Sequence, residues 1–247
     1  MKFSILTLFP EMFQALQAGI IKKAMANQLI QIDLWNPRDF AQDKHQCVDD
    51  RPYGGGPGMV MMAEPLQAAL QAAKKTFAEK PTVIYLSPQG RRFNQEAAIE
   101  LVNKPLILLA GRYEGIDERI IQQEIDEEWS VGDYILTGGE LAAMVMIDAM
   151  ARLIPGVVGD EESVMQDSLS SGLLKYPQYT RPEIFNELSV PKVLLSGHHE
   201  HIRQWRLKES LGKTWLKRPD LLEKKSLTKE EIALLTEFIE EFYQAKG

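Results

Sequence analysis

The sequence predicts an α/β fold built on a parallel sheet, and three apolar runs that each end in a glycine-bearing loop lead to that prediction. The runs are Val83–Gly90, Leu106–Gly115 and Trp129–Gly139. Short apolar runs of this kind are typical of strands that are buried on both faces of a parallel sheet. Such sheets bind ligands in the loops that follow their strands. Three of these loops in succession therefore indicate a ligand site at the carboxyl ends of three strands.

Predicted strands and helices alternate along residues 1–158. Phe3–Leu8 is a first buried strand, Pro10 begins a helix that reaches Met25, and Leu29–Trp35 alternates as a second strand. The long loop that follows, residues 36–59, is of a length that is usually functional or disordered. Further along, the pattern predicts helices at 64–75, 95–102, 116–124 and 140–153, and strands at 82–86, 106–110 and 128–131. This alternation is typical of a parallel sheet with right-handed crossovers.

The pattern changes after residue 158. Residues 159–171 are acidic and rich in serine, which predicts a flexible linker. Residues 172–247 carry helical signals only, at 199–210, 212–223 and 228–243, and predict a small all-helical domain. We therefore expect an α/β ligand-binding domain over residues 1–158 and a separate helical domain after the linker.

Composition and charge limit the class of protein and its compartment. The chain has 247 residues, a hydrophobic content of 45% and a single cysteine, Cys47, which excludes an intramolecular disulfide and a cysteine-based zinc site. The apolar run Phe3–Phe9 is too short for a signal peptide, and no segment reaches the roughly twenty apolar residues of a membrane span. We expect a cytoplasmic protein that does not enter a membrane.

The net charge of −7 conceals a basic segment, residues 191–225, which carries nine Lys or Arg and four Asp or Glu. A basic segment on an acidic chain favours one contact with an anionic partner, although a solvated helix face has the same composition.

Common nucleotide and metal motifs are absent from the sequence. None of the three loops contains the G-x-G-x-x-G pattern of dinucleotide sites. Gly212-Lys213-Thr214 resembles the end of a phosphate-binding loop, but Leu207 stands where the first glycine belongs. His198, His199 and His201 are adjacent rather than convergent, so we predict no metal site there.

Several longer motifs resemble one family. They are YGGGPGM at 53–59, LSPQGR at 86–91, AGRYEGIDER at 110–119, SVGDYILTGGE at 130–140 and DSLSSGLLKYPQYTRPE at 167–183. They are similar to the bacterial tRNA (guanine-37 N1)-methyltransferases of the knotted SPOUT class, and the similarity covers nearly the whole chain. The resemblance implies a parallel α/β sheet with a C-terminal trefoil knot, followed by the small all-helical domain.

The resemblance also implies a cofactor and partners. S-adenosylmethionine is the implied methyl donor, the anticodon stem-loop of tRNA is the implied substrate, and a homodimer is implied in which each active site takes residues from both subunits. The sequence leaves open whether a divalent cation such as Mg²⁺ assists. The implied cofactor residues lie in the three loops: Tyr85, Leu86, Pro88, Gly111, Tyr113, Glu114, Gly115, Val131, Gly132, Tyr134, Ile135, Leu136, Gly138 and Gly139.

Methyl transfer to guanine N1 needs a base, because this nitrogen carries a proton, and a cation that stabilises charge on O6. The resemblance implies that Asp167 is the base and Arg152 the cation. From the residues alone, Asp167 is one of several linker acids and Arg152 complements the dipole at the end of a helix. Glu114 faces the cofactor, or else pairs with Arg112 or Arg119.

Expected tRNA contacts lie in two segments. The long loop, which we expect to close over the target base, contributes His45, Asp49, Arg51 and Pro57. The basic segment contributes candidate phosphate contacts: Lys192, Arg203, Arg206, Lys208, Lys213, Lys217 and Arg218. Two other functions stay open on the residues alone, a nucleotide-dependent phosphotransferase and a non-catalytic RNA-binding protein.

Overall fold

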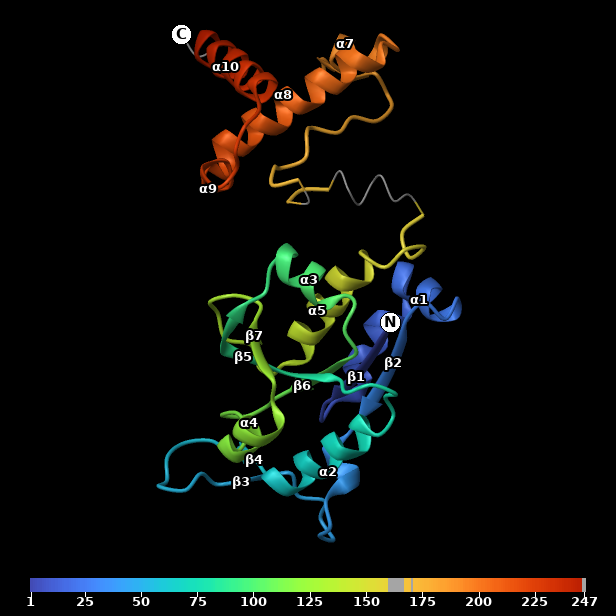
Figure 1. The fold of residues 1–247 in the computed structure, drawn as a ribbon, viewed down its shortest axis with the longest axis vertical. Coiled ribbons are helices and arrows are strands. Elements are labelled where there is room, and N and C mark those ends of the chain that lie inside the picture. Colours follow the sequence, from blue (N-terminus) through green and yellow to red (C-terminus); the bar gives the residue numbers. More distant parts are fainter. Residues whose placement is uncertain (160–166, 170, 246–247) are drawn as a thin grey trace. The chain divides into compact units, whose positions relative to one another are not determined.

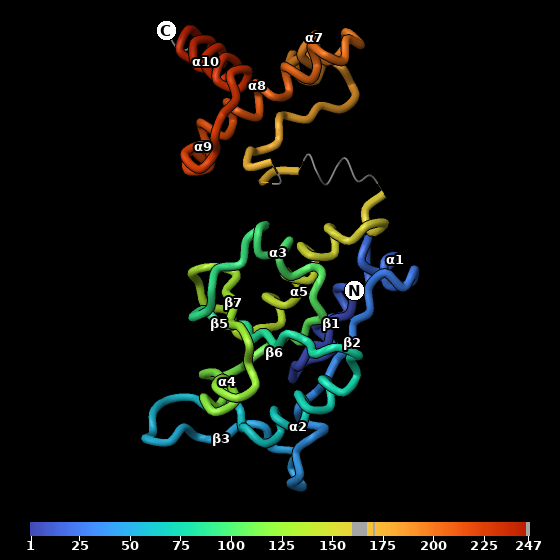
Figure 2. The backbone as a smooth tube through the Cα atoms, viewed as in Figure 1, coloured from blue at the N-terminus to red at the C-terminus, as the bar shows by residue number. Residues whose placement is uncertain are grey.

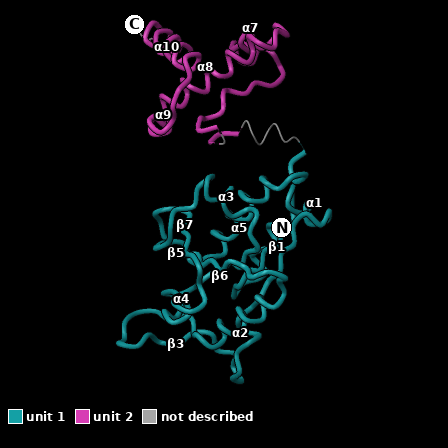
Figure 3. Tube along the Cα trace, in the orientation of Figure 1, with its two compact units in different colours: residues 1–161 teal, residues 162–247 magenta. Residues whose placement is uncertain are grey.

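The chain divides into two compact units, unit 1 (Met1–Glu161) and unit 2 (Glu162–Gly247), coloured separately in Figure 3. The computed structural model describes residues 1–159, 167–169 and 171–245. The predicted linker, residues 159–171, falls mostly outside the described residues. No helix in the described part of the chain has the length and apolar character needed to cross a membrane.

Unit 1 is built on a parallel sheet, which confirms the predicted α/β fold (Figure 1). Within the described residues its strand order is β2-β1-β6-β5-β7. The strands are β1 (Lys2–Leu6), β2 (Gln31–Trp35), β5 (Thr82–Arg92), β6 (Leu106–Ala110) and β7 (Glu127–Ser130). β5 continues beyond its predicted end because its pairing with β7 shifts register between Leu86 and Arg91 and then resumes.

Helices cover both faces of this sheet (Figures 1 and 2). One core includes α1 (Gly19–Ala26), α3 (Gln95–Leu101) and α5 (Glu140–Ala151), and the other includes α2 (Ala63–Lys74) and α4 (Glu118–Glu124). Along β6, Leu106 and Leu108 belong to the first core, whereas Ile107 and Leu109 belong to the second. Burial on both faces explains why these strands are apolar without alternation.

The helix predicted from Pro10 to Met25 is wrong as a single element. The chain forms a 3₁₀ helix, η1 (Pro10–Gln17), and then α1. Ala18 between them is extended, with φ −128° and ψ 164°, and Gly19 has φ +63°. A glycine adopts this left-handed conformation without the steric penalty of a Cβ, so the chain changes direction here.

The long loop of residues 36–59 has structure of its own. It contains η2 (Pro37–Phe40) and the short strand β3 (Asp49–Asp50), which pairs antiparallel with β4 (Val60–Met61). Met61 also forms a parallel bridge with Ile116, in the segment between β6 and α4. In Figure 2 this loop lies close to α4 and α2. The loop is therefore fastened to the chain that leaves β6.

Unit 2 contains α7 (Lys192–Leu195), α8 (His199–Lys217), α9 (Pro219–Glu223) and α10 (Lys229–Gln244). The predicted break between two helices at residue 211 is wrong, because α8 is continuous to Lys217. Gly212 lies within α8 where the helix meets α10, and a Cβ at this position would lie 2.3 Å from Cγ of Phe238. The glycine thus permits close packing of two helices and does not end one.

The prediction that unit 2 is all-helical is also wrong. β8 (Ile184–Phe185) and β9 (Leu188–Ser189) form an antiparallel hairpin. Its two turn residues, Asn186 and Glu187, have φ of 49° and 66°. Positive φ at both positions is the conformation of a type I′ turn, one of the two common two-residue hairpin turns. Glutamate is an unusual residue for that conformation, so the turn has a weak sequence signal.

We predict that Gly212→Leu lowers the free energy of unfolding of unit 2 by about 1–3 kcal/mol, because the new side chain overpacks the contact with Phe238. Chemical denaturation followed by circular dichroism measures the change. Lys217→Ala, an exposed position on the same helix, serves as the control and should leave stability nearly unchanged. A stabilised Gly212→Leu variant would contradict the close packing of α8 on α10.

Candidate functional site

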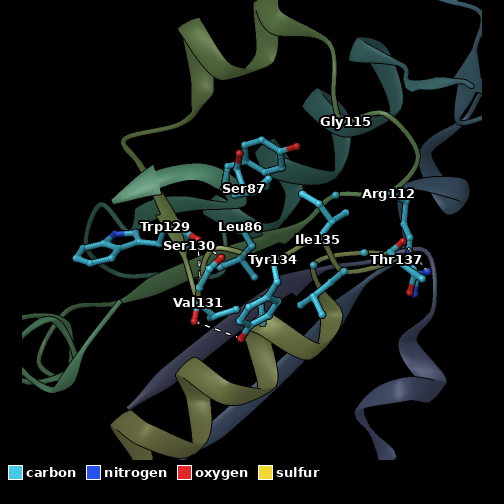
Figure 4. A pocket seen from close by; sticks show the side chains of 18 of the residues that line it. Leu86, Ser87, Arg112, Gly115, Trp129, Ser130, Val131, Tyr134, Ile135 and Thr137 are labelled. Atoms are coloured by element: carbon cyan, nitrogen blue, oxygen red, sulfur yellow. Dashed lines mark hydrogen bonds between the residues drawn. The ribbon is translucent and has the colours of Figure 1, made fainter. Parts of the chain in front are cut away.

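A cavity of about 260 Å³ lies at the carboxyl ends of β6 and β7 and beside the middle of β5, where the pairing of β5 with β7 shifts register (Figure 4). Its walls come from the three glycine-bearing loops and from the ends of their strands. Every residue that the sequence predicts for the cofactor lines this cavity. Ser87, Arg112, Trp129, Ser130, Thr137 and Ala142 also line it and are additional to the prediction. The volume is near the lower end of the ~300–1,000 Å³ range of small-molecule sites.

Backbone segments approach one another closely around the cavity. The N–H of Gly139 donates to the carbonyl of Gly111 at 2.9 Å, which joins the loop after β7 to the loop after β6. A Cβ on Gly139 would lie 2.7 Å from Cα of Ala110, and one on Gly111 would lie 2.8 Å from the ring of Tyr85. Only glycine permits these approaches without displacement of the chain, so the cavity walls are formed largely by backbone.

The loop after β7 is held by its own hydrogen bonds, drawn in Figure 4. The Ser130 hydroxyl donates to the carbonyl of Gly132 at 3.0 Å and accepts from the N–H of Gly132 at 3.2 Å. The Tyr134 hydroxyl donates to the carbonyl of Val131 at 3.3 Å. Ile135, 81% exposed, and Tyr134, 58% exposed, leave apolar surface at the cavity. The wall therefore combines fixed backbone polar groups with apolar side chains.

Two tyrosines of the cavity differ in environment. Tyr85 is buried, and burial raises the pKa of its phenol, with the carboxylate of Glu128 as the second cause. Tyr113 is half-exposed and has φ +61°, an uncommon conformation for a bulky residue. Partial burial, followed by a hydrogen bond with Asp49, raises the pKa of Tyr113. Tyr113 thus links the cavity to the long loop.

Sequence reasoning missed an ion pair between Arg112 and Glu140. Glu140 is fully buried at the first position of α5, and its Oε2 lies 2.9 Å from Nε of Arg112. The Thr7 hydroxyl donates to Oε1 of Glu140 at 2.9 Å. A carboxylate at the start of a largely apolar helix is the sequence signal that could have identified it. Arg112 therefore forms its ion pair with Glu140 and not with Glu114.

Glu114 lies against the long loop. Its N–H donates to the carbonyl of Met59 at 2.9 Å, and a Cβ on Gly58 would lie 2.5 Å from Cγ of Glu114. The alternative that Glu114 pairs with Arg112 or Arg119 is wrong, because these arginines bind the carboxylates of Glu140 and Asp117. Glu114 lines the cavity together with the loop glycines.

The long-loop residues predicted to contact substrate do not share one position. Asp49 contributes to the raised pKa of Tyr113, which lines the cavity, whereas His45 and Pro57 are exposed in their loop. Arg51 lines a different cavity of about 760 Å³, between the long loop and the start of α4. Of these four residues, Asp49 is the one whose charge acts on the pKa of a residue that lines the glycine-loop cavity.

The two predicted catalytic residues belong to different units. Arg152 is the half-buried C-cap residue of α5 in unit 1. Asp167 belongs to unit 2, where Nζ of Lys175 lies 3.2 Å from its Oδ1. Within unit 2, Asp167 lines a cavity of about 320 Å³ whose other residues include Tyr176, Arg203 and Arg206.

Carboxylates of α10 neutralise part of the basic segment. Arg203 pairs with Glu200 of its own helix and with Glu230 of α10. Lys208 lies 2.8 Å from both Glu237 and Glu241, and hydrogen bonds with these two carboxylates raise its pKa although burial opposes the rise.

The remaining predicted phosphate contacts differ in their neighbouring side chains and in the helix that carries them. The guanidinium of Arg206 lies 4.8 Å from the ring centre of Tyr176, and Arg218 pairs with Asp220. Lys192 begins α7, and Lys213 and Lys217 are on α8. Among these side chains, Arg206 is the one that the structure places on an aromatic ring.

The structure does not support the two alternative motifs, a phosphate-binding loop at residues 212–214 and a metal site at His198, His199 and His201. Gly212, Lys213 and Thr214 lie inside α8 and form no loop, which excludes a phosphate-binding loop there. The ring of His198 stacks on that of His201, and its Nδ1 accepts from the N–H of His201 at the start of α8. Within the described ranges, no group of three or more His, Cys, Asp or Glu side chains could hold a metal ion.

Comparison with known proteins agrees with this arrangement. Residues 1–224 match the family model described as tRNA (Guanine-1)-methyltransferase TrmD. The tRNA (guanine-N(1)-)-methyltransferase of Shewanella sediminis is 59% identical over 97% of this chain and 100% of its own. The enzyme of the same name from Klebsiella pneumoniae strain 342 is 58% identical over 99% of this chain and 96% of its own. The resemblance inferred from the motifs is confirmed, and the chain belongs to the tRNA (guanine-1)-methyltransferase family.

Proposed function

We propose that this chain transfers the methyl group of S-adenosylmethionine to N1 of guanine 37, next to the anticodon of tRNA. The observation that carries the proposal is the convergence of three segments, residues 85–88 of β5 and the loops after β6 and β7, on one cavity. Ligands of parallel α/β sheets bind at the carboxyl ends of the strands. Family membership supplies the methyl transfer and the tRNA substrate.

The cavity suits S-adenosylmethionine in the kinds of group that it offers. Backbone amides and carbonyls of the loop glycines are accessible because these residues have no side chain. Leu86, Val131 and Leu136 offer apolar surface for a planar base, and Glu114 offers a carboxylate for a cationic group. When bound, the donor supplies a methyl group on a positively charged sulfur.

Asp167 and Arg152 are the proposed catalytic residues. Asp167 accepts the proton of guanine N1, so that the nitrogen lone pair becomes available to form the new N–C bond. Arg152 stabilises the negative charge that develops on O6 of the guanine. Asp49 and the other long-loop candidates hold the target base, which must leave its stack in the anticodon loop at a cost of a few kcal/mol.

The proposal includes the assembly and the compartment. Unit 2 contributes the contacts with the tRNA backbone, and residues 159–171 join the α/β domain to this tRNA-binding domain. The enzyme acts as a homodimer in which each active site combines residues of both subunits, and the family resemblance supports this assembly. The enzyme works in the cytoplasm, where its tRNA substrates are.

We predict that the wild-type protein methylates a tRNA transcript with guanosine at position 37 and not one with adenosine there. Asp167→Asn should lower kcat by about 10²-fold or more, because proton removal from N1 is lost. Incorporation of labelled methyl from S-adenosylmethionine is the measurement. Affinity for S-adenosylmethionine, measured by calorimetry, should be unchanged in the variant. Equal methylation of both transcripts would contradict position 37, and full activity of Asp167→Asn would contradict the base.

We predict that Gly139→Ala weakens binding of S-adenosylmethionine by about tenfold or more, because small displacements of positioning groups have large effects. Its Cβ would meet the backbone of Ala110 at 2.7 Å, which no side-chain rotation can relieve. Gly159→Ala is the matched control, since no atom lies within 4 Å of a Cβ there. Unchanged affinity in Gly139→Ala would show that the contact with β6 does not shape the donor site.

We predict that Arg206→Gln weakens tRNA binding more than Arg203→Gln does. Arg203 already pairs with Glu200 and Glu230, so its charge is less available to a phosphate. Removing a true phosphate contact should lower the slope of log affinity against log salt by about one. Filter binding over a salt series measures both quantities. Equal effects of the two substitutions would mean that tRNA displaces the carboxylates from Arg203.

A further inference from the structure

Unit 1 contains a buried charged group that the proposed chemistry does not use, the carboxylate of Glu140. Its side chain is 0% exposed. Arg112 Nε donates to Oε1 at 3.1 Å and lies 2.9 Å from Oε2, and the hydroxyl of Thr7 donates to Oε1 at 2.9 Å. A buried carboxylate requires partners of this kind, because its solvation by water is lost.

The guanidinium of Arg112 connects several segments that are distant in the sequence. It belongs to the loop after β6, and its Nη1 donates to the carbonyl of Thr137 in the loop after β7 at 3.1 Å. Its Cζ lies 4.4 Å from the ring centre of Phe9, which follows β1. Figure 4 shows Arg112 and Thr137 side by side. One side chain thus holds two loops of the cavity against each other.

The contact between Arg112 and the loop after β7 is tight. A Cβ on Gly138 would lie 2.3 Å from Nε of Arg112, so the glycine backbone rests directly on the guanidinium. Arg112, Thr137 and Gly138 all line the cavity. A change in the position of this guanidinium therefore moves the cavity wall.

We propose that Arg112 and Glu140 form a positioning pair for the methyl donor. Glu140 fixes the guanidinium by charge and hydrogen bonding, and the guanidinium fixes the loops after β6 and β7 at the separation that the donor needs. This role rests on the proposed function, in which the cavity holds S-adenosylmethionine. Neither residue takes part in the proton transfer.

The test replaces the charged pair by a neutral one, Arg112→Met with Glu140→Gln. Loss of one partner alone leaves a buried charge, whereas loss of both charges is often tolerated by the fold. The glutamine carbonyl still accepts from Thr7. The matched control is Arg119→Met with Asp117→Asn, an ion pair of the same type at 2.7 Å that is exposed and lies outside this cavity.

Titration calorimetry with S-adenosylmethionine is the primary measurement, with circular dichroism and thermal unfolding on the same samples. We expect the double variant to fold and to bind the donor about tenfold or more weakly, with a matching rise in its KM, while the control pair binds normally. Arg112→Lys, which keeps the charge but not the planar fork, should recover part of the affinity. If the double variant does not fold, a wild-type affinity of folded Arg112→Lys would overturn the proposal, and a weaker affinity at wild-type stability would support it.

A folded double variant with wild-type affinity would overturn the positioning role alone. Absence of donor binding to the wild-type protein would overturn the proposed function as well. The two failures are therefore distinguishable.

Discussion

Unit 1 depends on a close approach of backbone to backbone, where Gly139 passes the end of β6. The chain leaves β7 at one edge of the sheet, crosses the end of β5, and must then reach a position over β6 to begin α5. Its contact with Ala110 and its hydrogen bond to Gly111 fix that crossing. α5 then packs into the same core as α1 and α3. This course of the chain is consistent with the trefoil knot of the SPOUT class, to which the family belongs.

The same crossing creates the cavity. Strands of a parallel sheet all end at one edge, so three loops that return from this edge enclose a space between them. The glycines keep the loops thin, and the side chains of Leu86, Val131 and Leu136 line the space. The shape of the site is thus largely a consequence of the fold, and Arg112 is a side chain that fixes two of its loops.

The sequence pattern predicted the parallel sheet because buried strands leave long apolar runs such as Leu106–Ala110. It predicted the cavity for the same reason, since the loops follow those runs. It could not predict the break at Ala18, because the local backbone conformation, and not the apolar periodicity, determines where the helix ends there. Nor could it show that Gly212 serves packing against Phe238, or that Arg112 meets Glu140, because both contacts join residues far apart in the chain.

The acidic face of α10 has a consequence for the tRNA contacts proposed for unit 2. Carboxylates of this helix already neutralise Arg203 and Lys208, so an arriving phosphate must exchange with a covalently tethered competitor. In such an exchange one anion replaces another at the same cation, so little electrostatic free energy is gained. A random polyanion is therefore a poor ligand. An RNA whose shape offers stacking or groove contacts at the same time can meet the cost of the exchange. Under the proposed function, the acidic helix thereby shifts selection from charge density to RNA shape.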